Sequence, residues 1–174
     1  GHADFAARSA REMALTRDVI ERFGRADNER IASGRGLVNI ARFTHGGRCA
    51  HWPAGADDAG VPPLVSAAAF AGTCPMCHEA LDLFIDAVGS VAGNMAILGV
   101  ARAGVFVGGG IPPKILPAFQ TGAFLEAFRR KPPMDGLLTA GWRLIRWLGR
   151  IERAGCVVLM AVIVLSMSVQ ILTR

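Results

Sequence analysis

The chain has 174 residues and a mass of 18.4 kDa, with 52% apolar and 19% charged side chains. This composition can bury a hydrophobic core, which excludes a globally disordered chain, and the length suits one compact domain rather than two. The net charge of +5 is unevenly distributed, because residues 1–139 carry 14 basic and 13 acidic side chains whereas residues 140–174 carry 5 and 1. The positive charge therefore belongs to the C-terminal segment, and we expect no nucleic-acid partner.

The first elements are predicted from short-range signals. Residues 1–5 are predicted to be the end of a strand. Ser9 followed by Glu12 is a capping-box pattern, which predicts a helix to about Phe23, where Gly24 ends it.

Further helices follow. Asp27 can cap a second, short helix, and a third is predicted around residues 37–41. Residues 44–63 are rich in Gly, Pro and Asp, which predicts a loop. The longest helix is expected from about Pro75 to Leu98, with Thr73 as its candidate cap, because apolar residues recur there at helical spacing.

The next segment is predicted to contain a short buried strand over residues 104–107, ended by the triple glycine Gly108–Gly110. Ile111 and two prolines then start a helix, and another covers about residues 122–130. A glycine turn of this kind lets backbone approach a flat or phosphorylated ligand closely, although such turns are more often structural.

The C-terminal segment changes in character after about Thr139. Residues 154–173 are 20 residues without a charge, enough to cross a bilayer as a helix, and four arginines precede them. We predict a basic amphipathic linker over residues 139–153 and a transmembrane helix over 154–173, with the arginine side in the cytoplasm. A buried core helix is the alternative.

The string Cys74-Pro-Met-Cys77-His78 fits the attachment pattern of c-type haem. Together with Cys49 and His51, the same two thiols also give two ligand pairs that a tetrahedral zinc site could use. The third interpretation, which we favour, is a pair of reduced thiols in the first turn of a helix.

Four strings occur in order along residues 1 to about 138: Gly1–Ala6 (GHADFA), Asn28–Asn39 (NERIASGRGLVN), Gly93–Ala96 (GNMA) and Gly104–Lys114 (GVFVGGGIPPK). Taken together, they resemble the bacterial glucokinase family of the hexokinase-like type, which is distinct from the repressor/kinase group. The resemblance implies an α/β fold of the actin/hexokinase (ribonuclease H-like) type, present in part and mostly helical here, followed by the C-terminal apolar helix.

The resemblance also implies the ligands. Glucose and ATP would bind in a cleft between two lobes, with Mg²⁺ accompanying ATP. The family's sugar-binding His and Glu fall on His2 and Glu29, and its adenosine-side glycines on Gly108, Gly109 and Gly110. A carboxylate that accepts hydrogen bonds from two vicinal hydroxyls suits a hexose. The Cys74–Cys77 pair also resembles a family feature, so we expect these thiols to be free and metal-free.

Some family motifs are not found. The Asp-x-Gly-Gly-Thr phosphate strand and the Asn-Asp pair with the catalytic Asp do not occur, so no catalytic residue is assigned. We therefore expect a glucokinase fragment over residues 1–138 that is inactive alone, with homodimerisation possible. The alternative is a membrane-anchored interaction module with a passive kinase-derived lobe, because residues 140–174 loosely resemble the first helix of the small subunit of tripartite periplasmic transporters.

Overall fold

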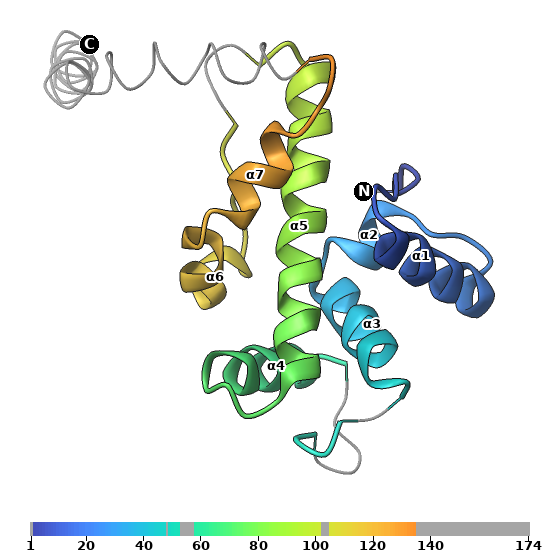
Figure 1. Cartoon of the computed structure of the whole chain (residues 1–174), viewed down its shortest axis with the longest axis vertical. Helices are drawn as coiled ribbons and strands as arrows, with labels where there is room; N and C mark the ends of the chain where they lie inside the picture. The colour runs from blue at the N-terminus through green and yellow to red at the C-terminus, as the bar shows by residue number, and fades with distance from the viewer. Residues whose placement is uncertain (1, 48, 53–57, 102–104, 135–174) are drawn as a thin grey trace, which may run out of the picture.

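A computed structural model describes residues 2–47, 49–52, 58–101 and 105–134. Within these ranges the chain is helical (Figure 1). The elements are α1 (Ala10–Phe23), α2 (Asn28–Ile31), α3 (Gly34–His45), α4 (Val61–Phe70), α5 (Pro75–Leu98), the 3-10 helix η1 (Pro112–Ile115), α6 (Leu116–Gln120) and α7 (Ala123–Arg129).

Helix α5 is the centre of the fold. Figure 1 shows it as a long upright helix with α1, α2 and α3 on one side, α6 and α7 on the other, and α4 across its N-terminal end. Cys77, Leu81 and Phe84 of α5 are buried in one hydrophobic cluster with Leu37 and Ile40 of α3. Most of the core therefore lies between α5 and the helices that precede it in the chain, and a second, smaller cluster lies between α5 and α7.

The composition of α5 also meets a membrane criterion. Among the described residues, Pro75–Leu98 is long and apolar enough to cross a bilayer, but half of its most apolar window is buried by the rest of the domain. Core helices of globular proteins share this property, and its packing makes α5 such a helix. The predicted linker 139–153 and apolar helix 154–173 lie outside the described residues.

Several predicted boundaries are confirmed. The Ser9 hydroxyl accepts a hydrogen bond from Glu12 N–H at the start of α1, and Gly24 ends the helix in the left-handed region with φ of 75°. Asp27 caps α2, and α5 has its predicted ends. The cap predicted for α5 is wrong, because Thr73 donates its hydroxyl to the Ala68 carbonyl instead.

Two other predictions need correction. The loop predicted over residues 44–63 ends earlier, because α4 begins at Val61; its two prolines occupy the first turn, where no N–H donor is needed. The strand predicted over residues 104–107 is not formed in its described part, and Phe106 is 96% exposed. A strand needs a partner for its backbone groups, and the described residues offer none there.

The α/β expectation is therefore met only in its helical part. Sheet pairing within the described ranges is limited to one antiparallel bridge between Asp4 and Asp27. This bridge contains the predicted strand end near residues 1–5.

Candidate functional site

The bridge between Asp4 and Asp27 brings the two predicted sugar-binding residues into one region. The Ala3 carbonyl accepts a hydrogen bond from Asn28 N–H at 2.9 Å. His2 precedes the acceptor residue, and Glu29 follows the donor residue. Two side chains that are 27 positions apart in the sequence are thus attached to neighbouring backbone.

Asp27 orients His2. The His2 ring nitrogen Nδ1 lies 3.1 Å from Asp27 Oδ2, and Asp27 is only 2% exposed while the His2 side chain is 77% exposed. Burial opposes ionisation of Asp27, but hydrogen bonds from His2 and from Arg30 N–H, together with the charge of Arg30, lower the pKa of its carboxyl. A buried carboxylate therefore holds one side of an imidazole whose other side is open to a ligand.

Glu29 is exposed in the first turn of α2, and the residues after it fix the corner between α2 and α3. Ser33 accepts from Gly36 N–H at the start of α3 and donates to the Glu29 carbonyl. The Asn39 amide donates to the Arg30 carbonyl at 2.9 Å. A Cβ on Gly36 would lie 2.2 Å from the Ile31 carbonyl oxygen, so the two helices meet this closely only with glycine there. The Asn28–Asn39 string therefore builds the support that presents Glu29.

The sequence prediction missed the role of Asp27 as partner of His2. It identified Asp27 only as the cap of α2, a role that the structure confirms. The available signal was the predicted strand end at residues 1–5, since an extended segment beside α2 places residue 2 near this cap. No spacing rule pairs a specific strand residue with a specific cap, however.

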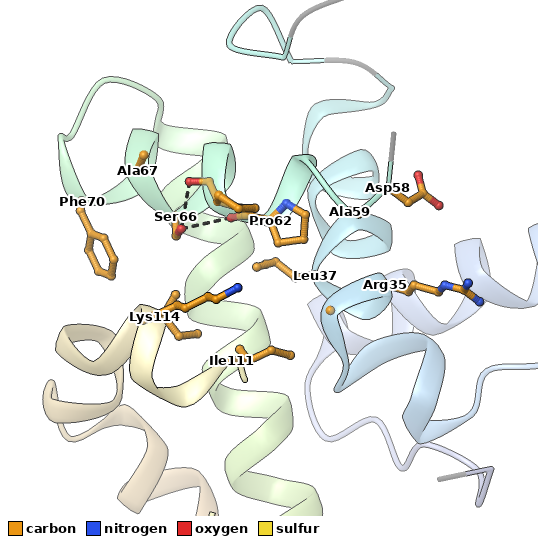
Figure 2. A pocket seen from close by; sticks show the side chains of 13 residues that line it. Arg35, Leu37, Asp58, Ala59, Pro62, Ser66, Ala67, Phe70, Ile111 and Lys114 are labelled. Carbon is orange, nitrogen blue, oxygen red and sulfur yellow. Dashed lines mark hydrogen bonds between the residues drawn. The ribbon is translucent and has the colours of Figure 1, made fainter. Parts of the chain in front are cut away.

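A pocket of about 1030 Å³ lies between α3, α4 and η1 (Figure 2). Its walls are mostly apolar and include Leu37, Pro62, Phe70 and Ile111. In Figure 2 the Lys114 side chain reaches into the pocket from η1, whereas Arg35 extends away from it. An apolar pocket with few polar groups is typical of sites for small organic ligands.

The predicted adenosine-side glycines precede this pocket in the chain. Gly108, Gly109 and Gly110 are followed at once by Ile111, which forms part of the pocket wall. Gly109 has φ of 108°, a conformation that favours glycine, and Cβ atoms on all three would meet no heavy atom within 4 Å. The turn therefore presents open backbone beside the pocket.

The described residues around the pocket offer Mg²⁺ a poor set of ligands. Asp58 is the carboxylate among the pocket residues, and it already pairs with Arg42 at 2.7 Å. Because Mg²⁺ prefers several oxygen ligands, we assign no metal ligand here.

The motif Cys74–His78 does not have the geometry that haem attachment needs. Cys74 and Cys77 are buried, whereas His78 is exposed and pairs with Asp82 at 2.9 Å, on the same helix. Burial raises the pKa of Cys77 well above its usual range. Burial also opposes ionisation of Cys74, but a hydrogen bond with His45, hydrogen bonds from the backbone and thiol of Cys77, and one from Cys49 lower the pKa of Cys74 to about 6. The thiols thus face His45 and not His78.

Comparison with known proteins identifies the family. A family model described as Glucokinase matches residues 1–141. The glucokinase of Chromobacterium violaceum is 39% identical over 139 residues, which cover 79% of this chain and 38% of the relative. The glucokinase of Mesorhizobium japonicum is 36% identical over 140 residues, covering 79% and 39%.

A crystal structure of a glucokinase from an Antarctic psychrotroph is similar in fold. It superposes with a TM-score of 0.68 at 28% identity, covering 79% of this chain and 41% of that chain. The chain thus spans about two fifths of the length of the relatives it matches. With a family match over residues 1–141, this chain belongs to the glucokinase family.

Proposed function

We propose that residues 1–138 form part of the glucose and ATP sites of a glucokinase, which transfers the γ-phosphoryl group of MgATP to the 6-hydroxyl of glucose. The observation that carries this proposal is the bridge that brings His2 and Glu29 to one exposed edge, supported by the Asn28–Asn39 string. We assign this chain the positioning of substrates and no proton-transfer step.

In the sugar site, the Glu29 carboxylate accepts hydrogen bonds from two hexose hydroxyls, and the His2 imidazole contacts a third. Asp27 keeps the imidazole in a fixed orientation, because the Nδ1 contact uses one ring nitrogen and leaves Nε2 for the ligand. A hydrogen bond to a charged group contributes about 1.5–3 kcal/mol. Glu29 therefore provides a large part of the binding free energy of a weakly bound sugar.

In the nucleotide site, the adenosine lies in the pocket between α3, α4 and η1, and the backbone of Gly108–Gly110 passes close to the ribose. Lys114 would attract the phosphates, because its ammonium is the charged group that reaches into this pocket in Figure 2. Mg²⁺ enters as part of the MgATP substrate.

Binding measurements on the full chain test the two sites separately. For glucose, followed by ligand-detected NMR, Glu29→Gln is expected to weaken binding at least about tenfold. Glu21→Gln on the exposed face of α1 is the matched control and should have no effect. Equal glucose affinities for the two variants would contradict the sugar site.

For the nucleotide site, binding of a non-hydrolysable ATP analogue is measured by calorimetry. Lys114→Gln should weaken binding of the analogue without changing that of glucose, and Arg17→Gln, an exposed cation on α1, is its control. Unchanged binding of the analogue to the Lys114 variant would contradict the assignment of the pocket.

A further inference from the structure

Four side chains with metal-binding atoms converge at the base of α5. They are His45 at the end of α3, Cys49 in the turn that follows, and Cys74 and Cys77 at the start of α5. Their ligand atoms all lie within 4.8 Å of one another, and the three thiols are buried. The proposed glucose and ATP sites use none of these residues.

Four of the six distances between these atoms lie close to the edges of a coordination tetrahedron. Zinc bonds of about 2.3 Å to sulfur and about 2.0–2.1 Å to nitrogen give edges of about 3.8 Å between sulfurs and about 3.6 Å between sulfur and nitrogen. The Cys49 sulfur lies 3.9 Å from that of Cys74 and 3.8 Å from that of Cys77. The Nε2 atom of His45 lies 3.3 Å from the Cys74 sulfur and 3.7 Å from the Cys77 sulfur.

The surroundings hold the imidazole in the orientation that a metal ligand requires. Nδ1 of His45 lies 2.7 Å from the Ala41 carbonyl, which can only accept, so the proton is on Nδ1 and the lone pair of Nε2 faces the thiols. The Trp52 ring packs against the imidazole with centroids 5.4 Å apart. His51 N–H donates to the Cys49 sulfur at 3.4 Å.

We propose that His45, Cys49, Cys74 and Cys77 bind one Zn²⁺ ion in a tetrahedral structural site. Each thiol releases its proton to solvent as its sulfur joins the metal, and His45 binds as neutral imidazole. Four protein ligands leave no open position for water, so the site stabilises the fold and performs no catalysis. The ligand spacings, His-x₃-Cys and Cys-x₂-Cys, are short ones of the kind that zinc sites use.

This assignment differs from all three sequence-based interpretations of these thiols. The sequence suggested His51 as the histidine ligand, but its side chain is exposed. His45 is the residue that lies with the three thiols and provides the fourth ligand. The alternative of free thiols leaves three sulfurs and an imidazole gathered in the core with no common partner. A disulfide would use only two of the sulfurs, which now lie 3.8–3.9 Å apart, against about 2.05 Å in a bond.

The proposed ion would anchor both ends of the segment that carries α4. Cys49 precedes this segment and Cys74 follows it, while α4 supplies Pro62, Ser66 and Phe70 to the pocket of Figure 2. Zinc therefore fixes one wall of that pocket against α3 and α5. Loss of the ion should loosen α4 more than α7, which packs on the distant part of α5.

The first test measures zinc in the purified, untagged full chain, kept reduced and dialysed against metal-free buffer. One equivalent of zinc per chain is expected. His45→Gln should weaken zinc affinity by more than the roughly 10–100-fold that loss of an outer-shell partner costs, and His51→Gln should retain the equivalent of zinc. Absence of bound zinc, or its loss from the His51 variant alone, would overturn the assignment.

A second measurement does not depend on whether variants fold. Co²⁺ added to the zinc-free wild-type chain should give the intense visible bands of tetrahedral cobalt and sulfur-to-cobalt charge-transfer absorption, and added Zn²⁺ should abolish both. Hydrogen exchange of α4 should rise on zinc removal, with α7 unchanged. Weak bands typical of octahedral cobalt, or a Cys49–Cys74 disulfide that persists in protein purified under reducing conditions and is found by mass spectrometry, would overturn the proposal.

Discussion

Replacing Gly36 by alanine tests whether the contact between α2 and α3 supports the glucose edge. The new Cβ would lie 2.2 Å from the Ile31 carbonyl oxygen and 2.3 Å from its carbonyl carbon. Both are backbone atoms, so α2 must move by about 1 Å to restore van der Waals contact. Such overpacking lowers the free energy of unfolding by about 1–3 kcal/mol, whereas the better helix propensity of alanine raises it by about 0.5–1 kcal/mol.

The expected net loss for Gly36→Ala is about 0.5–2 kcal/mol of unfolding free energy, measured by urea denaturation, or a Tm lower by about 1–8 °C. Gly34→Ala is the matched control on the same helix, because its Cβ would meet only the Ile111 side chain, at 3.9 Å. This control should be neutral or stabilising by up to about 0.5 kcal/mol.

Glucose affinity gives the second readout. Because Glu29 lies on the helix that must move, Gly36→Ala should weaken glucose binding at least about tenfold, while Gly34→Ala should not change it. Equal stability and equal glucose affinity for the two variants would refute the reasoning that the α2–α3 contact depends on glycine.

Three other predictions use the same domain. Glu12→Gln removes a buried partner of Arg8 and should cost about 3 kcal/mol in urea unfolding, whereas Asp18→Asn breaks an exposed pair and should change stability by at most about 1 kcal/mol. The folded state lowers the pKa of Asp27. The ionised Asp27 carboxylate therefore stabilises the fold at pH values above its unfolded pKa of about 3.9, and this stabilisation is lost as pH falls through the folded pKa. Asp27→Asn should make the free energy of unfolding depend less on pH in this acidic range. Gly93→Ala places a Cβ 2.4 Å from a carbonyl oxygen of α7 and should lower Tm by several degrees. Glucose affinity should stay unchanged in this variant.

The helices with strong local signals could be predicted from the sequence. Ser9 and Gly24 delimit α1 because a hydroxyl cap and a left-handed glycine act on their own neighbours. Helix α4 was missed because the turn-forming residues before it include two prolines that in fact belong to its first turn. The strand over residues 104–107 was predicted from its apolar character, although a strand exists only with a partner strand.

The site residues could be predicted from the sequence to different degrees, because their positions depend on contacts between distant parts of the chain. His2 and Glu29 came from the family resemblance, and the structure brings them to one edge through a backbone bridge. The pairing of Asp27 with His2, and the choice of His45 over His51 near the thiols, follow from how helices dock. Hydrophobic periodicity gives the face of a helix, but not which residue of another element lies opposite.

The central position of α5 has a consequence for synthesis of the chain. Helices α3 and α4 precede α5, so they are available to cover it as soon as it leaves the ribosome. Helix α7 follows only after the 24 residues between Leu98 and Ala123. At about 5–20 residues per second, the face of α5 that receives α7 waits about 1–5 s without its cover. During that interval the nascent chain exposes the α7-binding face of an apolar helix that is long enough to cross a membrane. Chains arrested on the ribosome before α7 emerges should therefore bind a chaperone that recognises apolar segments, and longer arrested chains should release it.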